Sequence, residues 1–519
     1  MKHIYNFDSS FFKVVRVIPG LVTLLLLLAP IWATLIGKPE IVLYYVAFLS
    51  VYWFYKTIVT NIGNVIAFRR YKRAIALDWD VMISRLDWST LPNPEQLPAS
   101  YNDFKLVVLI PFYKEPYEVL QETVESIKSS TYDLRKVHIV FGVEERAGEL
   151  GEQNAKRLVE EYSPYFAEIK YYIHPEGIPG EAVGIAGANL SWASREYVKD
   201  VLARGDNLQE YQVIKYDSDM LIHPKFLSNY VHTYLTTPDR YNAFFSPAIM
   251  LYSNNYWEVP VLMRVFSGVL TLALMSEWVV AKKTKQSFSC YGFNLKLLHE
   301  IDYFDPKIGV DDTGFYWRAF LALDGNFRGE EFYAPCYNDA VQAESYVKTH
   351  IIQYKQLRRW GWGAIVYPMT LQGITNNKKI SIKKKVLSVA ELFRVYNLYS
   401  TITFLLFFSI PLLTLLNPDF GFQGSAHVLP KIVSYILTFA LLGLLPSRSI
   451  LEGLYGRPPK KYGVLFFLWH YFEQLMLIFF SLTLGFFPYL QAQMEMMFGK
   501  SMTFIVTPKV RGEGKVGGA

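Results

Sequence analysis

The sequence predicts an α/β domain on the cytoplasmic side, inserted between two sets of membrane helices, and three observations predict it. Apolar segments of membrane length lie near both ends of the 519-residue chain, in which 51% of the residues are hydrophobic. Between them, over residues 104–370, strand-like and helix-like segments alternate, which is typical of a parallel sheet with helices on both faces. Lysines and arginines crowd the ends of the apolar segments that face this region, as expected on the cytoplasmic side.

The first 75 residues predict a transmembrane hairpin. Residues 14–36 are long enough to span a bilayer, and residues 41–59 form a second, aromatic-rich apolar segment. The alternative for the first segment is a cleaved signal peptide, because Lys13 and Arg16 precede a short block of leucines. The second apolar segment follows at once, and this favours a hairpin that stays in the protein.

The middle of the chain predicts the α/β domain. Residues 76–103 contain three separate prolines that interrupt any long helix, so we expect a linker there. Residues 106–111 are then typical of a buried strand, 117–130 of a helix and 137–143 of a second strand. Ligands of such sheets bind at the carboxyl ends of the strands, where candidate residues are therefore expected.

The C-terminal apolar region, residues 386–490, predicts further membrane helices. Residues 392–416 and 432–445 are expected to span the bilayer. Residues 462–490 are too few for two crossings of about 20 residues each. We expect an interfacial or re-entrant arrangement there, which keeps the tail, residues 491–519, in the cytoplasm.

The charge pattern predicts how the chain is oriented in the membrane and argues against a nucleic-acid-binding protein. The cysteine content argues against a disulfide-stabilised protein. The basic clusters predict a multi-pass protein of the cytoplasmic (inner) membrane with its α/β domain in the cytoplasm, and they account for the net charge of +6, so we expect a lipid bilayer and no nucleic acid as partner. Residues 260–281 are apolar but carry two charges, which favours an amphipathic helix at the membrane surface. Two cysteines, Cys290 and Cys336, argue against a disulfide framework.

Asp217 and Asp219 are the first candidates for chemistry. They close an apolar strand-like run that begins at Gln212, and side chains two residues apart on a strand point to the same side of a sheet. Two such carboxylates can hold Mg²⁺ or Mn²⁺ against a diphosphate. The alternative is a surface loop or a helix N-cap.

Two further motifs follow. Asp311 and Asp312 precede an aromatic-rich helix, where a simple N-cap is the alternative to a catalytic acid pair. Gln356, Arg359 and Trp360 lie in the run Gln-Leu-Arg-Arg-Trp. An indole can pack on a sugar ring and a guanidinium can bind phosphate, whereas the alternative is a basic amphipathic helix on anionic lipid.

The order of these motifs resembles the inverting family 2 glycosyltransferases, which include cellulose, chitin and hyaluronan synthases. The resemblance covers residues 106 to 509 and implies a GT-A-type, Rossmann-like domain that moves a sugar from a nucleotide-sugar donor, a UDP-sugar first of all, to a growing glycan. It implies that Asp217 and Asp219 bind a cation and the diphosphate, and that Asp312 is the base. The family usually has Glu where this chain has Asp311, which leaves open which of the pair is the base. It also implies that Gln356, Arg359 and Trp360 hold the acceptor.

The donor pocket implied by the resemblance departs further from the family pattern. Lys114 replaces an asparagine of the first strand-end motif, Arg146 follows the second strand end, and the lysine of the Gly-Lys-x-x-Asn-type segment is missing. The residues that the resemblance implies to contact the donor are Pro111, Tyr113, Glu115 and Asn189, which match the family, and Glu144 and Glu145, which stand where the family usually has aspartates.

Two more segments resemble the synthases. Cys290 and Tyr291 match a loop that lies under the acceptor in that family. Thr507 and Lys509 match a gating loop of cellulose synthases, which implies that they reach the donor phosphates; an edge strand ending in a turn is the alternative. Two other functions stay open. The chain could transfer one sugar to a membrane lipid such as a polyprenyl phosphate, or it could be a catalytically idle scaffold or export subunit.

Overall fold

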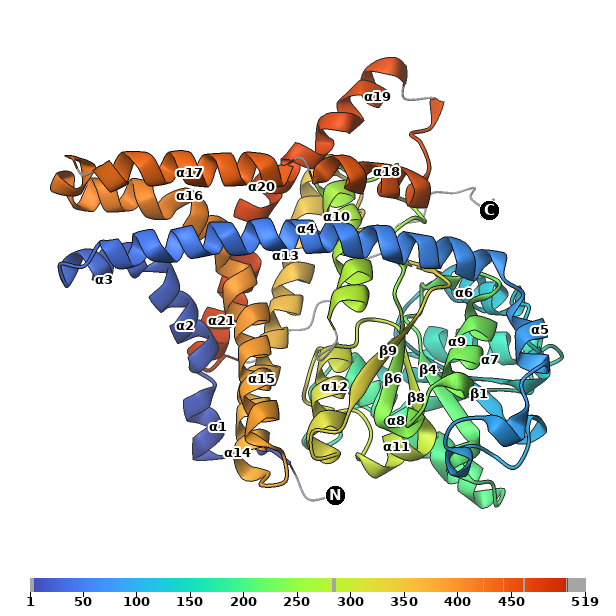
Figure 1. The fold of residues 1–519 in the computed structure, drawn as a ribbon. Helices are drawn as coiled ribbons and strands as arrows, with labels where there is room; N and C mark the ends of the chain where they lie inside the picture. The colour runs from blue at the N-terminus through green and yellow to red at the C-terminus, as the bar shows by residue number, and fades with distance from the viewer. Residues whose placement is uncertain are drawn as a thin grey trace.

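An α/β body and a set of long helices make up the protein (Figure 1). The computed structural model describes residues 4–281, 286–422, 424–441, 443–460, 463–500 and 502. The strands are β1 Lys105–Phe112, β2 Val137–Glu144, β3 Glu168–His174, β4 Tyr211–Lys215, β5 Leu221–Ile222, β6 Ala243–Pro247, β7 Met250–Leu251, β8 Tyr291–Asn294, β9 Arg328–Phe332 and β10 Cys336–Tyr337.

Helices precede, surround and follow these strands. Up to the last long strand they are α1 Ser10–Val15, α2 Ile18–Leu27, α3 Ala29–Leu35, α4 Glu40–Ala76, α5 Trp79–Ser84, α6 Tyr117–Lys128, α7 Glu149–Tyr162, α8 Ala186–Ala203, α9 Phe226–Thr236, α10 Val261–Val280, α11 Leu295–Glu300 and α12 Asp311–Ala322. After it come α13 Tyr346–Gly361, α14 Val366–Asn376, α15 Ile382–Phe393, α16 Tyr399–Leu416, α17 Gly424–Leu441, α18 Leu444–Tyr455, α19 Gly463–Phe472, α20 Met476–Leu482 and α21 Phe487–Met497.

The main sheet is mixed. Its seven strands have the order β3-β2-β1-β4-β8-β6-β9, and a second sheet has the order β5-β10-β7. Strands β3, β2, β1 and β4 are parallel, as predicted, but β8 runs antiparallel to both β4 and β6. The prediction of a wholly parallel sheet is therefore wrong at β8. The reversal brings the segment before β8 to the carboxyl end of β4.

Strand β1 lies between two hydrophobic cores, and its successive residues face one core and the other in turn. Val107 and Leu109 face a core that includes residues of α8 and α12, whereas Leu106, Val108 and Ile110 face a core that includes residues of α6, α7 and α9. This period of two is what a strand buried on both faces requires.

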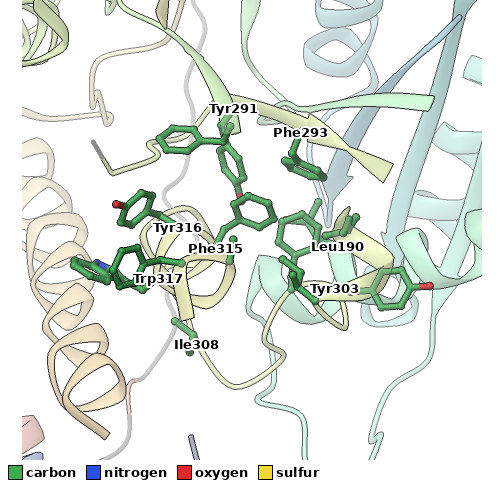
Figure 2. Packing of buried hydrophobic residues seen from close by; sticks show 14 of the residues in the cluster. Leu190, Tyr291, Phe293, Tyr303, Ile308, Phe315, Tyr316 and Trp317 are labelled. Carbon is green, nitrogen blue, oxygen red and sulfur yellow. The ribbon is translucent and has the colours of Figure 1, made fainter. Parts of the chain in front are cut away.

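The first core fixes the start of α12. Figure 2 shows its aromatic centre, where Phe315 of α12 packs against Phe293 and Tyr291 of β8, with ring centroids 4.5 and 5.1 Å apart. Trp317 and Tyr316 extend this packing along α12. Because these large side chains hold α12 on the sheet, the acid pair that opens the helix has a defined position.

Residues 76–103, expected to be a linker, are folded onto the α/β domain. They contain α5 and three 3-10 turns, η1 Trp88–Thr90, η2 Pro94–Gln96 and η3 Tyr101–Asp103. The fully buried Arg240 holds this segment, since its Nη1 donates to the carbonyl of Asn93 at 2.9 Å and its Nε to that of Tyr234 at 3.1 Å.

Five helices of the described chain are long and apolar enough to cross a membrane. The five segments are Ser10–Leu27, Glu40–Ala76, Val261–Val280, Ile382–Leu416 and Glu473–Met497.

Two predictions for the apolar segments are changed by the structure. The predicted first span is interrupted, because α2 ends at Leu27 and Pro30 stands in the first turn of α3, where its missing N–H would break a continuous helix. The residues predicted to form an amphipathic surface helix form α10, which packs against α4 and is largely buried.

The apolar helices run in two directions. Helices α4, α16 and α17 contact one another and lie side by side, whereas α13 and α15 run across that direction toward the α/β domain (Figure 1). Helix α13 packs against α21, so the segment with the Gln-Leu-Arg-Arg-Trp run lies between the sheet and the C-terminal helices.

Candidate active site

The carboxyl end of β4 carries a buried lysine beside an aspartate. Lys215 is the last residue of β4 and only 3% exposed, and its Nζ lies 2.6 Å from Asp217 Oδ1 and 3.0 Å from the carbonyl oxygen of Ser289. Burial by itself lowers the pKa of Lys215, but the carboxylates of Asp217 and Asp311 raise it well above its usual value. Lys215 therefore stays a fixed positive charge at the end of the strand.

Asp311 and Asp312 reach the same place from the first turn of α12. Asp311 Oδ2 lies 3.5 Å from Lys215 Nζ and accepts a hydrogen bond from Tyr291 Oη at 3.3 Å. Asp312 accepts from the backbone N–H of Ser289 at 3.0 Å and of Thr313 at 2.6 Å. Burial raises the pKa of Asp312 to about 6, helped by the charge of Asp311 and opposed by that of Lys215.

The segment before β8 joins the two acidic motifs. Ser289 donates its hydroxyl to Asp217 and its N–H to Asp312, and Ser287 donates its hydroxyl to the Asp312 carbonyl. The structure thus brings together Lys215, Asp217, Ser289, Asp311 and Asp312, which we call the strand-end cluster.

Lys215 and Ser289 are missing from the sequence-based candidates. For Lys215 a signal existed, because this lysine stands two residues before Asp217 in the predicted strand, which in the structure ends at Lys215. For Ser289 there was none, because its position depends on the antiparallel return of β8.

Helix α13 adds a cation to the strand-end cluster. Burial lowers the pKa of Arg359, and the nearby charges of Asp217, Asp312 and Asp311 work against that lowering. Of the two other predicted acceptor residues of the helix, Gln356 accepts from Gln353 at 3.1 Å, and the Trp360 ring lies 5.9 Å from that of Phe266.

The predicted acceptor residues Cys290, just before β8, and Tyr291, the first residue of β8, are both buried. Cys290 is 0% exposed, and its carbonyl accepts a hydrogen bond from Ser246 at 2.9 Å. Tyr291 is also fully buried, and its hydroxyl reaches Asp311. Tyr291 thus contacts the acid pair, whereas Cys290 belongs to the second core.

Glu115 ties the end of β1 to the turn after β4. Its Oε2 accepts from the N–H of Tyr113 at 2.7 Å and its Oε1 from the hydroxyl of Ser218 at 3.0 Å. Ser218 stands between Asp217 and Asp219, and Asp219 is only 5% exposed. The predicted donor residue Glu115 therefore also holds the aspartate turn in place.

The other predicted donor residues gather at the carboxyl ends of β1 and β2. Arg146 donates to Glu144 through Nε at 2.9 Å, and its guanidinium lies 4.7 Å from the centre of the Tyr113 ring. Asn189 is 1% exposed and donates to the carbonyl of Gly142 at 2.8 Å. Glu145 accepts from the N–H of Glu176 at 2.8 Å, and Pro111 pairs with Gly142 in the β1–β2 ladder.

The carboxylates fit a divalent cation that is bound together with a substrate. No group of three or more His, Cys, Asp and Glu side chains in the described chain is placed to hold a metal ion by itself. Mg²⁺, however, is usually bound by one or two carboxylates, with phosphate oxygens and water completing its shell. Asp217 and Asp219 are the predicted pair, but β4 ends at Lys215, so they lie in the turn after the strand and the prediction that a strand points them to one side is wrong.

Charge points the same way. Three carboxylates, those of Asp217, Asp311 and Asp312, act on the cations Lys215 and Arg359 of β4 and α13. The carboxylates exceed the cations by one among these five side chains, so the charge of a further cation is favourable there.

The predicted gating residues Thr507 and Lys509 lie outside the described residues. Met502, the last described residue, packs on Gly309 in the loop that leads to Asp311. Met502 therefore lies beside the loop before the acid pair.

Comparison with known proteins gives weak similarities to solved structures. The sequence matches no protein-family model and no curated protein. The mannosyltransferase PcManGT from Pyrobaculum calidifontis, solved with GDP-Man and Mn²⁺, has a TM-score of 0.40 and 15% identity over 78% of this chain and 99% of that one. TarS from S. aureus has a TM-score of 0.33 and 13% identity over 67% of this chain and 55% of that one. Its fragment 1–349 with UDP-GlcNAc has a TM-score of 0.33 and 14% identity over 68% and 91%.

Proposed function

We propose that this protein is an inverting glycosyltransferase of the cytoplasmic membrane that adds a sugar from a nucleotide-diphosphate sugar to a growing glycan. One observation carries the proposal. Three motifs far apart in the sequence, at residues 217–219, 311–312 and 356–360, supply charges to one place at the carboxyl end of β4. Ligands of open α/β sheets bind at this edge, and the motifs are those that resemble the family 2 enzymes.

Asp312 is the base in this proposal. A general base works best when its pKa lies near the working pH, and the pKa of Asp312 is about 6. Asp311 is instead close to the Lys215 ammonium and the Tyr291 hydroxyl. Asp312 takes the proton from the acceptor hydroxyl as its oxygen attacks the anomeric carbon opposite the leaving diphosphate, which inverts the configuration there.

Cations stabilise the leaving diphosphate. Arg359 provides a guanidinium that can form two parallel hydrogen bonds to phosphate oxygens. A Mg²⁺ or Mn²⁺ ion held by Asp217 and Asp219 would neutralise charge on the diphosphate when bound. Lys215 is already engaged by Asp217 and Ser289, so its role is to keep the carboxylates ionised and in place.

The acceptor lies along α13 in this proposal. Gln356 and Trp360 are four residues apart and so share one face of the helix, and an indole offers an apolar face for a sugar ring. Helix α13 also packs against α21, which belongs to the apolar C-terminal segments. A growing glycan held there would leave the site beside the membrane helices.

Nucleotide release by the purified full-length protein in detergent tests the function. A panel of nucleotide sugars, with UDP-sugars first, is incubated with Mn²⁺ or Mg²⁺ and with a chelator. We expect metal-dependent release from one donor, loss of that release in Asp219→Asn, and normal release in the matched control Asp103→Asn, at an exposed aspartate. Absence of both release and direct nucleotide binding for every donor would contradict the proposal and favour a scaffold.

A further inference from the structure

A buried polar triad joins the N-terminal segment to the loop before the acid pair. Tyr5 Oη donates to Asp305 Oδ2 at 2.5 Å, and Arg318 Nη1 donates to Tyr5 Oη at 2.9 Å and to Asp305 Oδ2 at 3.2 Å. The exposed fractions are 9% for Tyr5, 7% for Asp305 and 14% for the Arg318 side chain. Burying a hydroxyl, a carboxylate and a guanidinium is costly unless they hydrogen-bond to one another, as the Tyr5 hydroxyl, the Asp305 carboxylate and Nη1 of Arg318 do here, although Arg318 Nε has no hydrogen-bond partner among the described residues.

Asp305 shapes the loop that leads into α12. Its Oδ1 accepts from the N–H of Lys307 at 2.8 Å, and its carbonyl accepts from the N–H of Ile308 at 3.4 Å. The next carbonyl, that of Pro306, accepts from Ala182 at 2.9 Å. Only two residues then separate Ile308 from Asp311, so a shift of this turn is passed directly to the acid pair.

Arg318 connects α12 with the chain segment that precedes the loop. It lies in α12, seven residues after Asp311, so that it is part of the helix that the acid pair opens. Its Nη2 also donates to the carbonyls of Ile301 at 2.9 Å and Asp302 at 3.1 Å. Asp302 has a positive φ of 62° and the next residue, Tyr303, one of 59°, an uncommon conformation that needs support from its surroundings.

The N-terminal segment that carries Tyr5 is itself fixed. Asn6 donates its N–H to Gln372 at 2.8 Å, and the amide of Gln372 donates to Ser9 at 2.7 Å. Phe7 packs edge-on between the rings of Tyr5 and Phe12, at 5.2 and 4.9 Å. The Tyr5 hydroxyl is thus presented to the loop by a docked segment.

We propose that Tyr5 is a positioning residue for the Asp311–Asp312 pair and acts through Asp305 and Arg318. This inference rests on the proposed function, in which Asp312 is the base. The hydroxyl accepts from Arg318 and donates to Asp305, so it couples α12 to the loop before it. A misplacement of about 1 Å of a catalytic group can cost up to about a hundredfold in rate.

Tyr5→Phe in the full-length protein removes the hydroxyl and keeps the ring. We expect kcat to fall about fivefold to tenfold with KM for the donor unchanged, because the base moves while the donor contacts remain. The rate is divided by the number of intact sites, counted from the stoichiometry of nucleotide binding, so that a loss of folded protein does not imitate the effect. Tyr165→Phe, at a tyrosine that is 46% exposed, is the matched control and should be normal.

Hydrogen exchange supplies a readout that does not depend on activity. In Tyr5→Phe we expect the amides of residues 305–313 to exchange faster than in the unsubstituted protein, while those of α6, in the other core, exchange at the same rate. Unchanged exchange in this loop overturns the positioning role, whether or not the variant is active.

Asp312→Asn in the same assay separates the two proposals. If Asp312→Asn is inactive and Tyr5→Phe has a normal kcat, the positioning role is wrong and the base assignment stands. If Asp312→Asn keeps its turnover, the proposed function fails first, whatever Tyr5→Phe does. Loss of kcat in both variants, with faster exchange in the loop of Tyr5→Phe, is the expected result.

Discussion

The strand-end cluster can be compared with a second ionic cluster among the described residues, and the two differ in charge balance and in exposure. The strand-end cluster belongs to the α/β domain. The second, which we call the helix cluster, joins α10, α18 and α19. In it, Arg264 Nη2 lies 2.5 Å from Glu473 Oε1, His470 Nδ1 lies 2.7 Å from Glu473 Oε2, and Arg448 Nη1 lies 2.5 Å from His470 Nε2.

The two clusters differ in the features that distinguish a ligand-binding site from a structural ion cluster. In the helix cluster every member is 7% exposed or less, and hydrogen bonds run from one member to the next. In the strand-end cluster the Asp217 side chain is 40% exposed, and its three carboxylates outnumber its cations even when Arg359 is counted. A site that is open and carries excess charge can take a charged ligand from water, whereas a closed one holds helices together.

The largest expected effect is that of Asp312→Asn. Because an amide cannot take up the acceptor proton, we expect turnover to fall by roughly a thousandfold, within the range for loss of a general base. The amide keeps the size of the side chain but can accept only one of the two backbone N–H bonds that Asp312 accepts, so the temperature of unfolding should fall slightly. Turnover by the purified variant, measured beside its thermal unfolding, checks both parts; a variant that still turns over would move the base elsewhere.

Glu473→Gln tests the helix cluster. Removing this carboxylate leaves Arg264 without its charge partner in the cluster, and breaking a buried ion pair typically costs about 3 kcal/mol or more. We expect the free energy of unfolding in detergent to fall by about that amount while turnover per folded molecule is unchanged.

The matched control for that change is Glu452→Gln. Glu452 pairs with Arg457, whose side chain is 77% exposed, and exposed pairs contribute about 1 kcal/mol or less. Loss of turnover with unchanged stability in Glu473→Gln would show that the helix cluster is a functional site. The two clusters would then not differ in role.

A smaller effect on kcat/KM is expected when the pH is lowered. The base acts only when ionised, and the pKa of Asp312 is raised to about 6, so it becomes protonated as the pH falls through that value. We expect kcat/KM to fall about tenfold between pH 7 and pH 5.

Lys215→Met sharpens this test. Lys215 lowers the pKa of Asp312, so its removal should move the acidic limb to higher pH. A profile that is flat from pH 5 to pH 7, or a limb that moves to lower pH in Lys215→Met, would contradict the electrostatics described for the strand-end cluster.

Much of the fold could be predicted from local pattern. The buried strands β1, β2 and β4 and the helices α6 and α12 follow from apolar runs, alternation and an acidic first turn. Strand β8 could not, because its four residues are too few for a periodic signal and its direction depends on pairing with β4.

The candidate site shows the same limit. Asp217 and Asp311 could be read from motifs, but their meeting at Lys215 depends on the packing of α12 on β8. The contact of Tyr5 with Asp305 spans 300 positions of the chain, and no local pattern encodes it.

That last contact has a consequence for how the protein is made. Tyr5 leaves the ribosome first and its partner Asp305 follows 300 residues later. At synthesis rates of about 5–20 residues per second, the N-terminal segment waits roughly 15–60 seconds before it can dock. During that time α2 to α4 have already emerged and can enter the bilayer. The loop before the acid pair can therefore be locked only long after α2 to α4 have been synthesised, and a nascent chain carries no finished candidate site.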